Sequence, residues 1–181
     1  MRNSITAIDS SKRLMDIFRV SAVIPVLTIN NIKDAISLSE ALVEAGLTVI
    51  EVTLRTENAF KIIKEISSIK KAVVGAGTIL SESDVKKACY YGAQFGVSPG
   101  MTEKLRCSSE SEGLPLLGGV SSASEVMRML ENGYNIMKFF PAEASGGVAA
   151  LKSIAAPLPD AYFCPTGGIS GSNVEDYLCQ P

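Results

Sequence analysis

Short apolar runs alternate with amphipathic stretches along this chain, and the alternation restricts the folds open to it. The stretches with helical spacing of apolar residues begin near Asn31, Thr56, Ser81, Thr102, Ser122, Gly147 and Ser172. The pattern therefore repeats roughly every 20 to 25 residues, as expected for serial strand–helix units. Such units form a parallel sheet covered by helices, which is either open and doubly wound or closed as a barrel.

The apolar runs predict strands at 22–27, 47–54, 72–76, 95–98, 114–117, 136–140 and 161–164. Capping boxes, in which a serine and an acidic side chain bond the first N–H groups of a helix, are expected for Ser81 with Asp84, Ser122 with Glu125 and Ser172 with Glu175. No GxGxxG motif follows the first strand, which weakens the alternative of an open dinucleotide-binding sheet. About seven units fit the chain, so a barrel is expected to lack its eighth strand and helix.

The chain contains no histidine, and this excludes several kinds of catalytic site. Ser-His-Asp and Cys-His catalysis are impossible, and the commonest zinc ligand is missing. Catalysis must then depend on lysine, carboxylate, hydroxyl, thiol or backbone groups. The net charge of −2 argues against nucleic acid as a partner. No apolar stretch is long enough for a membrane span, and four scattered cysteines favour reduced thiols in the cytoplasm.

Lys138 lies inside an apolar strand candidate, where a lysine needs an explanation. Side chains alternate across a strand, so Ile136, Lys138 and Phe140 share one face. Removal from water favours a neutral amine, which can attack a ketone and form an imine. The alternative is a structural lysine at a strand end that reaches solvent or pairs with a carboxylate.

Glu51 and Arg55 are charged residues of another strand candidate and its end. Alternation places Val49, Glu51, Thr53 and Arg55 on one face, and in a barrel this polar face points to the axis because the helix layer is apolar. The carboxylate and the guanidinium are then expected near the carboxyl end of the strand, where barrel active sites lie. The alternative is a structural Glu–Arg ion pair.

Two glycine-rich segments, residues 75–78 and 165–168, follow strand candidates. Small residues allow backbone N–H groups to approach an anion, and Thr78 and Thr166 add hydroxyl donors. The second segment follows the seventh predicted strand, a position at which barrels often bind phosphate. The alternative is a pair of tight turns with no ligand.

Together these segments resemble the 2-keto-3-deoxy-6-phosphogluconate (KDPG) aldolase family. The matching runs occur in the family's order at residues 51–56, 74–78, 97–100, 137–143 and 163–168. The resemblance covers the chain from about Val23 to its end. It implies a (β/α)8 TIM barrel, a homotrimer, and a class I aldolase that forms a lysine imine and needs no cofactor or metal.

The resemblance also implies roles for nine residues. Two do chemistry: Lys138 matches the imine-forming lysine, and Glu51 matches the general acid/base. The others bind substrate: Arg55 and Thr78 match groups that hold the pyruvate carboxylate, Pro99 and Phe140 line the pyruvate pocket, and Thr166, Gly167 and Gly168 form part of the phosphate site.

The chain departs from the family pattern at three places. Gly118-Gly119 replaces a common Pro-Gly pair, which is expected to loosen the end of the fifth strand, and Ser145 replaces a common Asn. The Gly-Gly-Ser segment of the eighth unit, which completes the phosphate site, is absent. Residues 1–181 are thus expected to be a single aldolase barrel domain that is incomplete at its C-terminus. The missing segment beyond Pro181 is expected to span about 25 to 40 residues.

The expected activity is cleavage of a small-molecule partner, KDPG, to pyruvate and glyceraldehyde 3-phosphate. Two alternatives within the class are aldolases for 4-hydroxy-2-oxoglutarate (KHG) and for 2-keto-3-deoxy-6-phosphogalactonate. A third is metal-assisted aldol cleavage with carboxylate ligands. A non-catalytic remnant that binds pyruvate or phosphate is the alternative outside the enzyme class.

Overall fold

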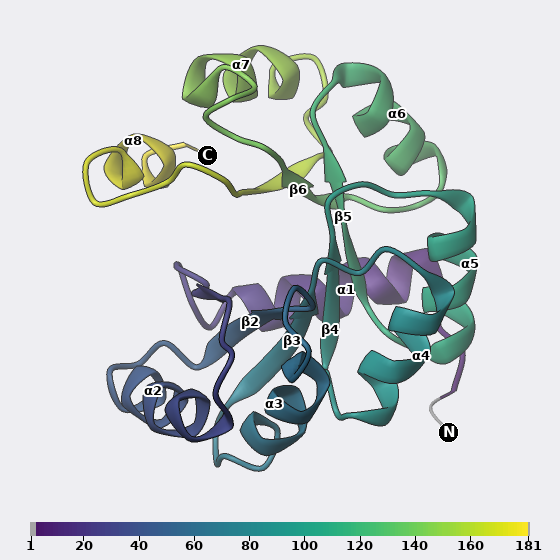
Figure 1. Ribbon diagram of the computed structural model, residues 1–181. Coiled ribbons are helices and arrows are strands. Elements are labelled where there is room, and N and C mark those ends of the chain that lie inside the picture. The colour runs from purple at the N-terminus through teal and green to yellow at the C-terminus, as the bar shows by residue number, and fades with distance from the viewer. Residues whose placement is uncertain (1–2, 181) are drawn as a thin grey trace.

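The computed structural model describes residues 3–180, which contain seven strands joined in one parallel sheet (Figure 1). The strands pair in chain order, β1 with β2 through to β6 with β7, and every pair is parallel. They are β1 (Val26–Leu27), β2 (Val49–Thr53), β3 (Val73–Gly77), β4 (Phe95–Ser98), β5 (Leu116–Val120), β6 (Ile136–Phe139) and β7 (Tyr162–Pro165).

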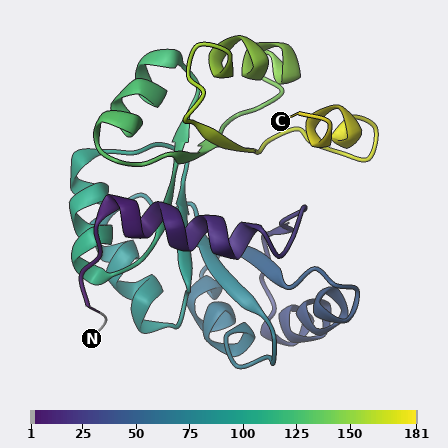
Figure 2. The ribbon, with the colours of Figure 1, turned by 180° about the vertical axis from the view of Figure 1, so that it is seen from behind.

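A helix follows each strand, and one more helix precedes β1. The helices are α1 (Ala7–Phe18), α2 (Ile32–Glu44), α3 (Ala59–Ile66), α4 (Glu82–Tyr90), α5 (Glu103–Glu112), α6 (Ala123–Glu131), α7 (Gly147–Ala155) and α8 (Val174–Leu178). Figures 1 and 2 show a sheet that curls, with helices on its outer side and an opening between its first and last strands. This arrangement confirms the predicted TIM-barrel-like fold without its eighth unit.

Alternation along the strands creates two apolar layers. Outward residues such as Ile50 and Val52 pack against the helices, where Ile62, Ile63 and Ile66 are fully buried on α3. Inward residues, including Val49 of the same β2, form a second cluster at the barrel axis. Each fully buried isoleucine contributes about 1.5–3 kcal/mol. The prediction that Glu51 shares the axial face with Val49 is thereby confirmed.

Helix α1 was not expected from the sequence. It crosses the end of the barrel at which the strands begin, where fully buried Leu14 joins the axial cluster. The Leu116 N–H donates to Ser10 Oγ at 3.3 Å, and the Asn135 N–H donates to Ser11 Oγ at 3.2 Å. α1 is amphipathic, because Leu14, Ile17 and Phe18 pack in the axial cluster at helical spacing, and a capping box of Thr6 with Asp9 begins the helix.

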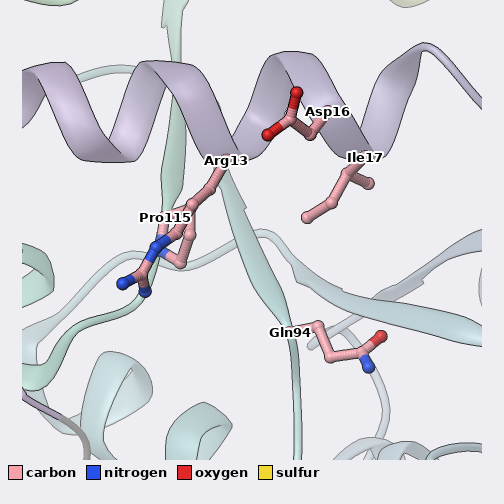
Figure 3. Close-up of a pocket in the computed structure, with 5 residues that line it drawn as sticks. All are labelled: Arg13, Asp16, Ile17, Gln94 and Pro115. Carbon is pink, nitrogen blue, oxygen red and sulfur yellow. The ribbon is translucent and has the colours of Figure 1, made fainter.

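A small surface pocket lies beneath α1. Figure 3 shows Arg13, Asp16 and Ile17 of the helix beside Gln94 and Pro115, which precede β4 and β5. The pocket has a volume of about 370 Å³. The pocket lies at the amino ends of the strands. In barrels this face contributes to stability, and the active site lies at the opposite face.

Several predicted element ends differ from those in the structure. The strand expected at 22–27 is reduced to the two residues of β1, and the helix expected near Thr56 begins at Ala59. The Thr56 hydroxyl instead donates to the Ile29 carbonyl at 2.8 Å, which joins the loop after β2 to the loop after β1. Here a contact between loops competes with the expected helix cap.

Two of the three predicted capping boxes are present and one is not. The boxes of Ser81 with Asp84 and of Ser122 with Glu125 begin α4 and α6. The box of Ser172 with Glu175 is wrong, since α8 starts after Asn173 without a side-chain cap. Ser172 Oγ lies 2.8 Å from Ser170 Oγ and so bonds within the preceding turn.

The expected loosening of β5 by its two glycines is also wrong. β5 continues through Gly118 and Gly119 to Val120, and all three residues are buried. A Cβ at Gly119 would lie 2.0 Å from the carbonyl oxygen of Pro99. Glycine therefore allows the chain after β4 to pass directly over β5.

Among residues 3–180, no helix is long and apolar enough to cross a membrane.

Candidate active site

Lys138 lies on β6, the strand next to the edge strand β7, with 6% of its surface exposed. It is opposite Gly119 of β5 on one side and Cys164 of β7 on the other. The low exposure shows that the surrounding residues enclose the lysine side chain. The alternative in which this lysine reaches solvent is therefore wrong.

Glu51 is the carboxylate that faces Lys138. It projects from the middle of β2 and is 5% exposed, and its Oε1 lies 3.9 Å from Lys138 Nζ. Burial raises the pKa of Glu51 above its usual value, while the positive charges of Lys138 and Arg55 oppose this rise. The ion pair of Glu51 is thus formed with Lys138 across the axis, and not with Arg55 as the structural alternative expected.

An aromatic ring lies beside the Lys138 amine. Phe140 directly follows β6, and its ring centroid lies 4.9 Å from Nζ. The face of an aromatic ring attracts a cation within about 6 Å. The Phe140 ring and the Glu51 carboxylate therefore both lie within interaction distance of the Lys138 nitrogen.

One cleft of about 1460 Å³ contains all nine residues predicted for the site. Arg55, Thr78 and Pro99 lie just beyond the carboxyl ends of β2, β3 and β4. The Arg55 side chain is exposed, and Thr78 takes the left-handed conformation with φ of 63°. This edge of the sheet is the one at which barrel enzymes place their chemistry.

The turn after β7 supplies the last three predicted residues. Gly167 and Gly168 have φ of 102° and 79°, values that favour glycine. The turn is held to the segment after β6, because the N–H groups of Ala142 and Glu143 donate to the carbonyls of Thr166 and Gly167 at 2.8 and 3.1 Å. The Thr166–Gly168 turn therefore keeps a fixed place beside the end of the lysine strand.

Cys164 is a site residue that the sequence analysis did not identify. It pairs with Lys138 in the sheet and lines the same cleft. Desolvation and the negative charge of Glu51 raise the pKa of its thiol to about 11, so the thiol stays protonated at neutral pH. Alternation along β7 could have placed Cys164 inside, but nothing in the sequence indicates which residue lies across from it.

Gly77 was predicted only as part of a glycine-rich segment that could approach an anion, and its place beside Glu51 was not. It ends β3 on the axial face, directly beneath the Glu51 side chain.

The described part of the chain contains no group of three or more Cys, Asp or Glu side chains arranged to hold a metal ion.

Comparisons with known proteins agree on one family. The model described as "KDPG and KHG aldolase" matches residues 14–181. The 2-dehydro-3-deoxy-phosphogluconate aldolase of Pseudoalteromonas atlantica is 47% identical over 167 residues, which cover 92% of this chain and 78% of that protein.

Solved structures give the same result. The KDPG aldolase of Zymomonas mobilis ZM4, crystallised with 3-phosphoglycerate, superposes with a TM-score of 0.89 at 43% identity, covering 92% of this chain and 80% of that one. The KDPG aldolase of Legionella pneumophila, captured with pyruvate as a covalent carbinolamine intermediate, gives a TM-score of 0.87 at 44% identity, covering 91% and 81%. On sequence and fold together, this chain belongs to the KDPG and KHG aldolase family.

Proposed function

We propose that this protein is a class I aldolase that cleaves KDPG to pyruvate and glyceraldehyde 3-phosphate. One observation carries the proposal: a buried lysine amine lies 3.9 Å from a buried carboxylate, in a cleft at the carboxyl ends of the strands. The names of the relatives, and the covalent pyruvate intermediate of the Legionella pneumophila enzyme, support the same chemistry.

The reaction would begin with attack of the Lys138 amine on the C2 ketone of KDPG. Loss of water from the carbinolamine gives an iminium, which withdraws electrons from C3. The C3–C4 bond then breaks as Glu51 accepts the proton of the C4 hydroxyl, directly or through water. Glyceraldehyde 3-phosphate leaves, and the bonding electrons remain on the enzyme as a pyruvate enamine. Protonation at C3 and addition of water release pyruvate and restore the amine.

The groups around Lys138 can stabilise the charged iminium and transfer the proton. The iminium is positive and forms between the Glu51 carboxylate and the Phe140 ring, both of which stabilise it. The raised pKa of Glu51 brings the carboxyl group closer to the neutral range, where it can both accept and return a proton.

The substrate would lie with its two anionic ends at opposite sides of the cleft. Arg55 and Thr78, after β2 and β3, would hold the pyruvate carboxylate, while Pro99 and Phe140 line the pocket for the keto acid. The turn of Thr166, Gly167 and Gly168 would bind phosphate through its backbone N–H groups.

Replacing Arg55 with lysine tests the carboxylate site. Arginine can grip a carboxylate with two parallel hydrogen bonds, and lysine cannot. The KM for KDPG should rise about tenfold, which is the loss expected for one charge-assisted hydrogen bond. Steady-state kinetics measure this change, with Arg128→Lys as a control, because Arg128 is exposed and lies outside the cleft lining. An unchanged KM would remove Arg55 from the site.

The family resemblance supports a homotrimer, and the scattered cysteines support a place in the cytoplasm. Light scattering on the eluted peak of a sizing column measures the assembly. A trimer is expected, and a monomer at enzyme-like concentration would contradict it.

Turnover of three keto acids tests the proposed reaction. Pyruvate release is followed with lactate dehydrogenase and NADH for KDPG, KHG and the phosphogalactonate epimer of KDPG. KDPG should give the highest kcat/KM, and a chelator should change nothing. KHG is the second substrate in the family's description. A preference for KHG would make this protein a KHG aldolase of the same mechanistic class. Loss of activity with chelator would favour metal-assisted cleavage, and no turnover on any of them would favour a non-catalytic remnant.

A further inference from the structure

The carboxylate of Glu51 lies over a position on β3 that has no side chain. Glu51 pairs with Gly75 in the sheet, and its side chain extends along β3 to Gly77. A Cβ built at Gly77 would lie 2.1 Å from Glu51 Oε1 and 2.8 Å from both Cγ and Cδ. The same Oε1 is the atom nearest the Lys138 amine in their ion pair.

These contacts distinguish Gly77 from the other glycine on the same face of β3. A Cβ at Gly75 would meet three ring carbons of Phe95 at 2.3 to 2.6 Å, inside the axial apolar cluster. At Gly77 the three nearest atoms all belong to Glu51. Gly75 therefore makes room for the core, whereas Gly77 makes room for the carboxylate of the site.

The backbone at Gly77 does not itself require glycine. Gly77 lies in a regular strand and is not one of the residues with positive φ. Its carbonyl accepts a bond of 2.8 Å from the Leu54 N–H, and alanine keeps this bond. An alanine methyl would therefore conflict chiefly with one flexible side chain, which can swing away without unfolding the sheet.

We propose that Gly77 is a positioning residue that keeps open the space in which the Glu51 carboxylate lies beside Lys138. A methyl group at this position would push the carboxylate off the strand and away from the amine. This inference rests on the proposed function, because a displaced carboxylate affects turnover only if Glu51 transfers the proton.

The proposal predicts a split between imine formation and cleavage in the Gly77→Ala variant. Lys138 is untouched, so borohydride should still trap pyruvate on the enzyme. Cleavage of KDPG should fall about 10²-fold, the usual effect of misplacing a catalytic group by about 1 Å. Gly171→Ala is the matched control, because a Cβ there has no atom within 4 Å; it should leave trapping and cleavage unchanged.

A double-mutant cycle with Glu51→Ala separates positioning from general damage. Alanine removes Cγ, Cδ and Oε1, which are the three atoms that a Cβ at Gly77 would meet. Once the carboxylate is gone, Gly77→Ala should lower kcat no further, so the double variant should match Glu51→Ala rather than show the product of the two losses. The effect of Gly75→Ala on kcat should combine with Glu51→Ala additively, because its conflict is with Phe95. Wild-type cleavage by Gly77→Ala, or additivity in the cycle, would overturn the proposal.

A measurement of stability covers the case in which Gly77→Ala folds poorly. If the conflict is with Glu51, removing that side chain relieves it, and Gly77→Ala with Glu51→Ala should recover the Tm of the Glu51→Ala variant. A Tm that stays low would overturn the proposal. This comparison of Tm values depends on no catalytic step. If the wild type fails to trap pyruvate, the proposed function is refuted, but the Tm comparison still tests the contact between Gly77 and Glu51.

Discussion

The Lys138→Arg variant should lose cleavage of KDPG by about 10⁴-fold or more, as when a nucleophile is removed. Arginine preserves the positive charge beside Glu51 and Phe140, so the pair across the axis can persist. Its guanidinium remains protonated in proteins and forms no imine. The loss should appear in kcat under saturating substrate, measured by pyruvate release.

A matched substitution isolates the chemistry from charge and size. Lys64 is an exposed lysine on α3, far from the cleft lining, and Lys64→Arg should retain wild-type turnover. The Tm of Lys138→Arg shows whether the larger head group is tolerated. Turnover by a folded Lys138→Arg variant at more than a small fraction of the wild-type rate would mean that another amine is the nucleophile.

The Glu51→Gln variant should cleave KDPG about 10²- to 10⁴-fold more slowly, the usual cost of a lost general acid/base. Glutamine retains the shape of the side chain and its place above Gly77 but cannot accept the proton. Pyruvate should still form an imine with Lys138, more slowly than in the wild type. Stopped-flow cleavage and borohydride trapping measure the two steps separately.

The dependence of kcat/KM on pH gives an independent test of Glu51. A carboxylate acts as the base only when ionised, so wild-type activity should fall as the pH decreases through the pKa of Glu51. Burial raises that pKa, which places the fall at a higher pH than for an ordinary glutamate. In Glu51→Gln this acidic limb should disappear, and in exposed Glu65→Gln it should remain. Near-normal cleavage by Glu51→Gln would make Glu51 only a structural partner of Lys138.

The sequence was sufficient to predict which face of β2 carries the site. Alternation placed Glu51 on the axial face, because the neighbouring outward residues Ile50 and Val52 are apolar and must pack against helices. For Lys138 it predicted only that Ile136 and Phe140 share its face, since both faces of that strand are apolar. It could not predict that Glu51 and Lys138 form the ion pair. Their separation depends on how far the sheet curls between β2 and β6, which is a property of many strand pairings together. The local pairing of Glu51 with Arg55 was therefore the natural but incorrect structural alternative.

Other differences have local causes. α1 was overlooked although Leu14, Ile17 and Phe18 recur at helical spacing, because its first half buries two serines that bond to the backbone where β5 and β6 begin. The third capping box failed because Ser172 bonds to Ser170 in a tight turn. Gly77 is a subtler case: a glycine in a strand signals that something approaches closely, but only the folded chain shows that the approaching group is the Glu51 carboxylate.

The most direct test of the account is mass spectrometry after incubation with pyruvate and borohydride. Reduction converts an imine into a stable secondary amine, so the intact protein should gain one pyruvate-derived adduct per chain. Peptide mapping should place it on Lys138, and the Lys138→Arg variant should remain unlabelled. An adduct on a different lysine, or labelling of the Lys138→Arg variant, would contradict the assignment of Lys138, and a wild-type protein that gains no mass would contradict the Schiff-base mechanism itself.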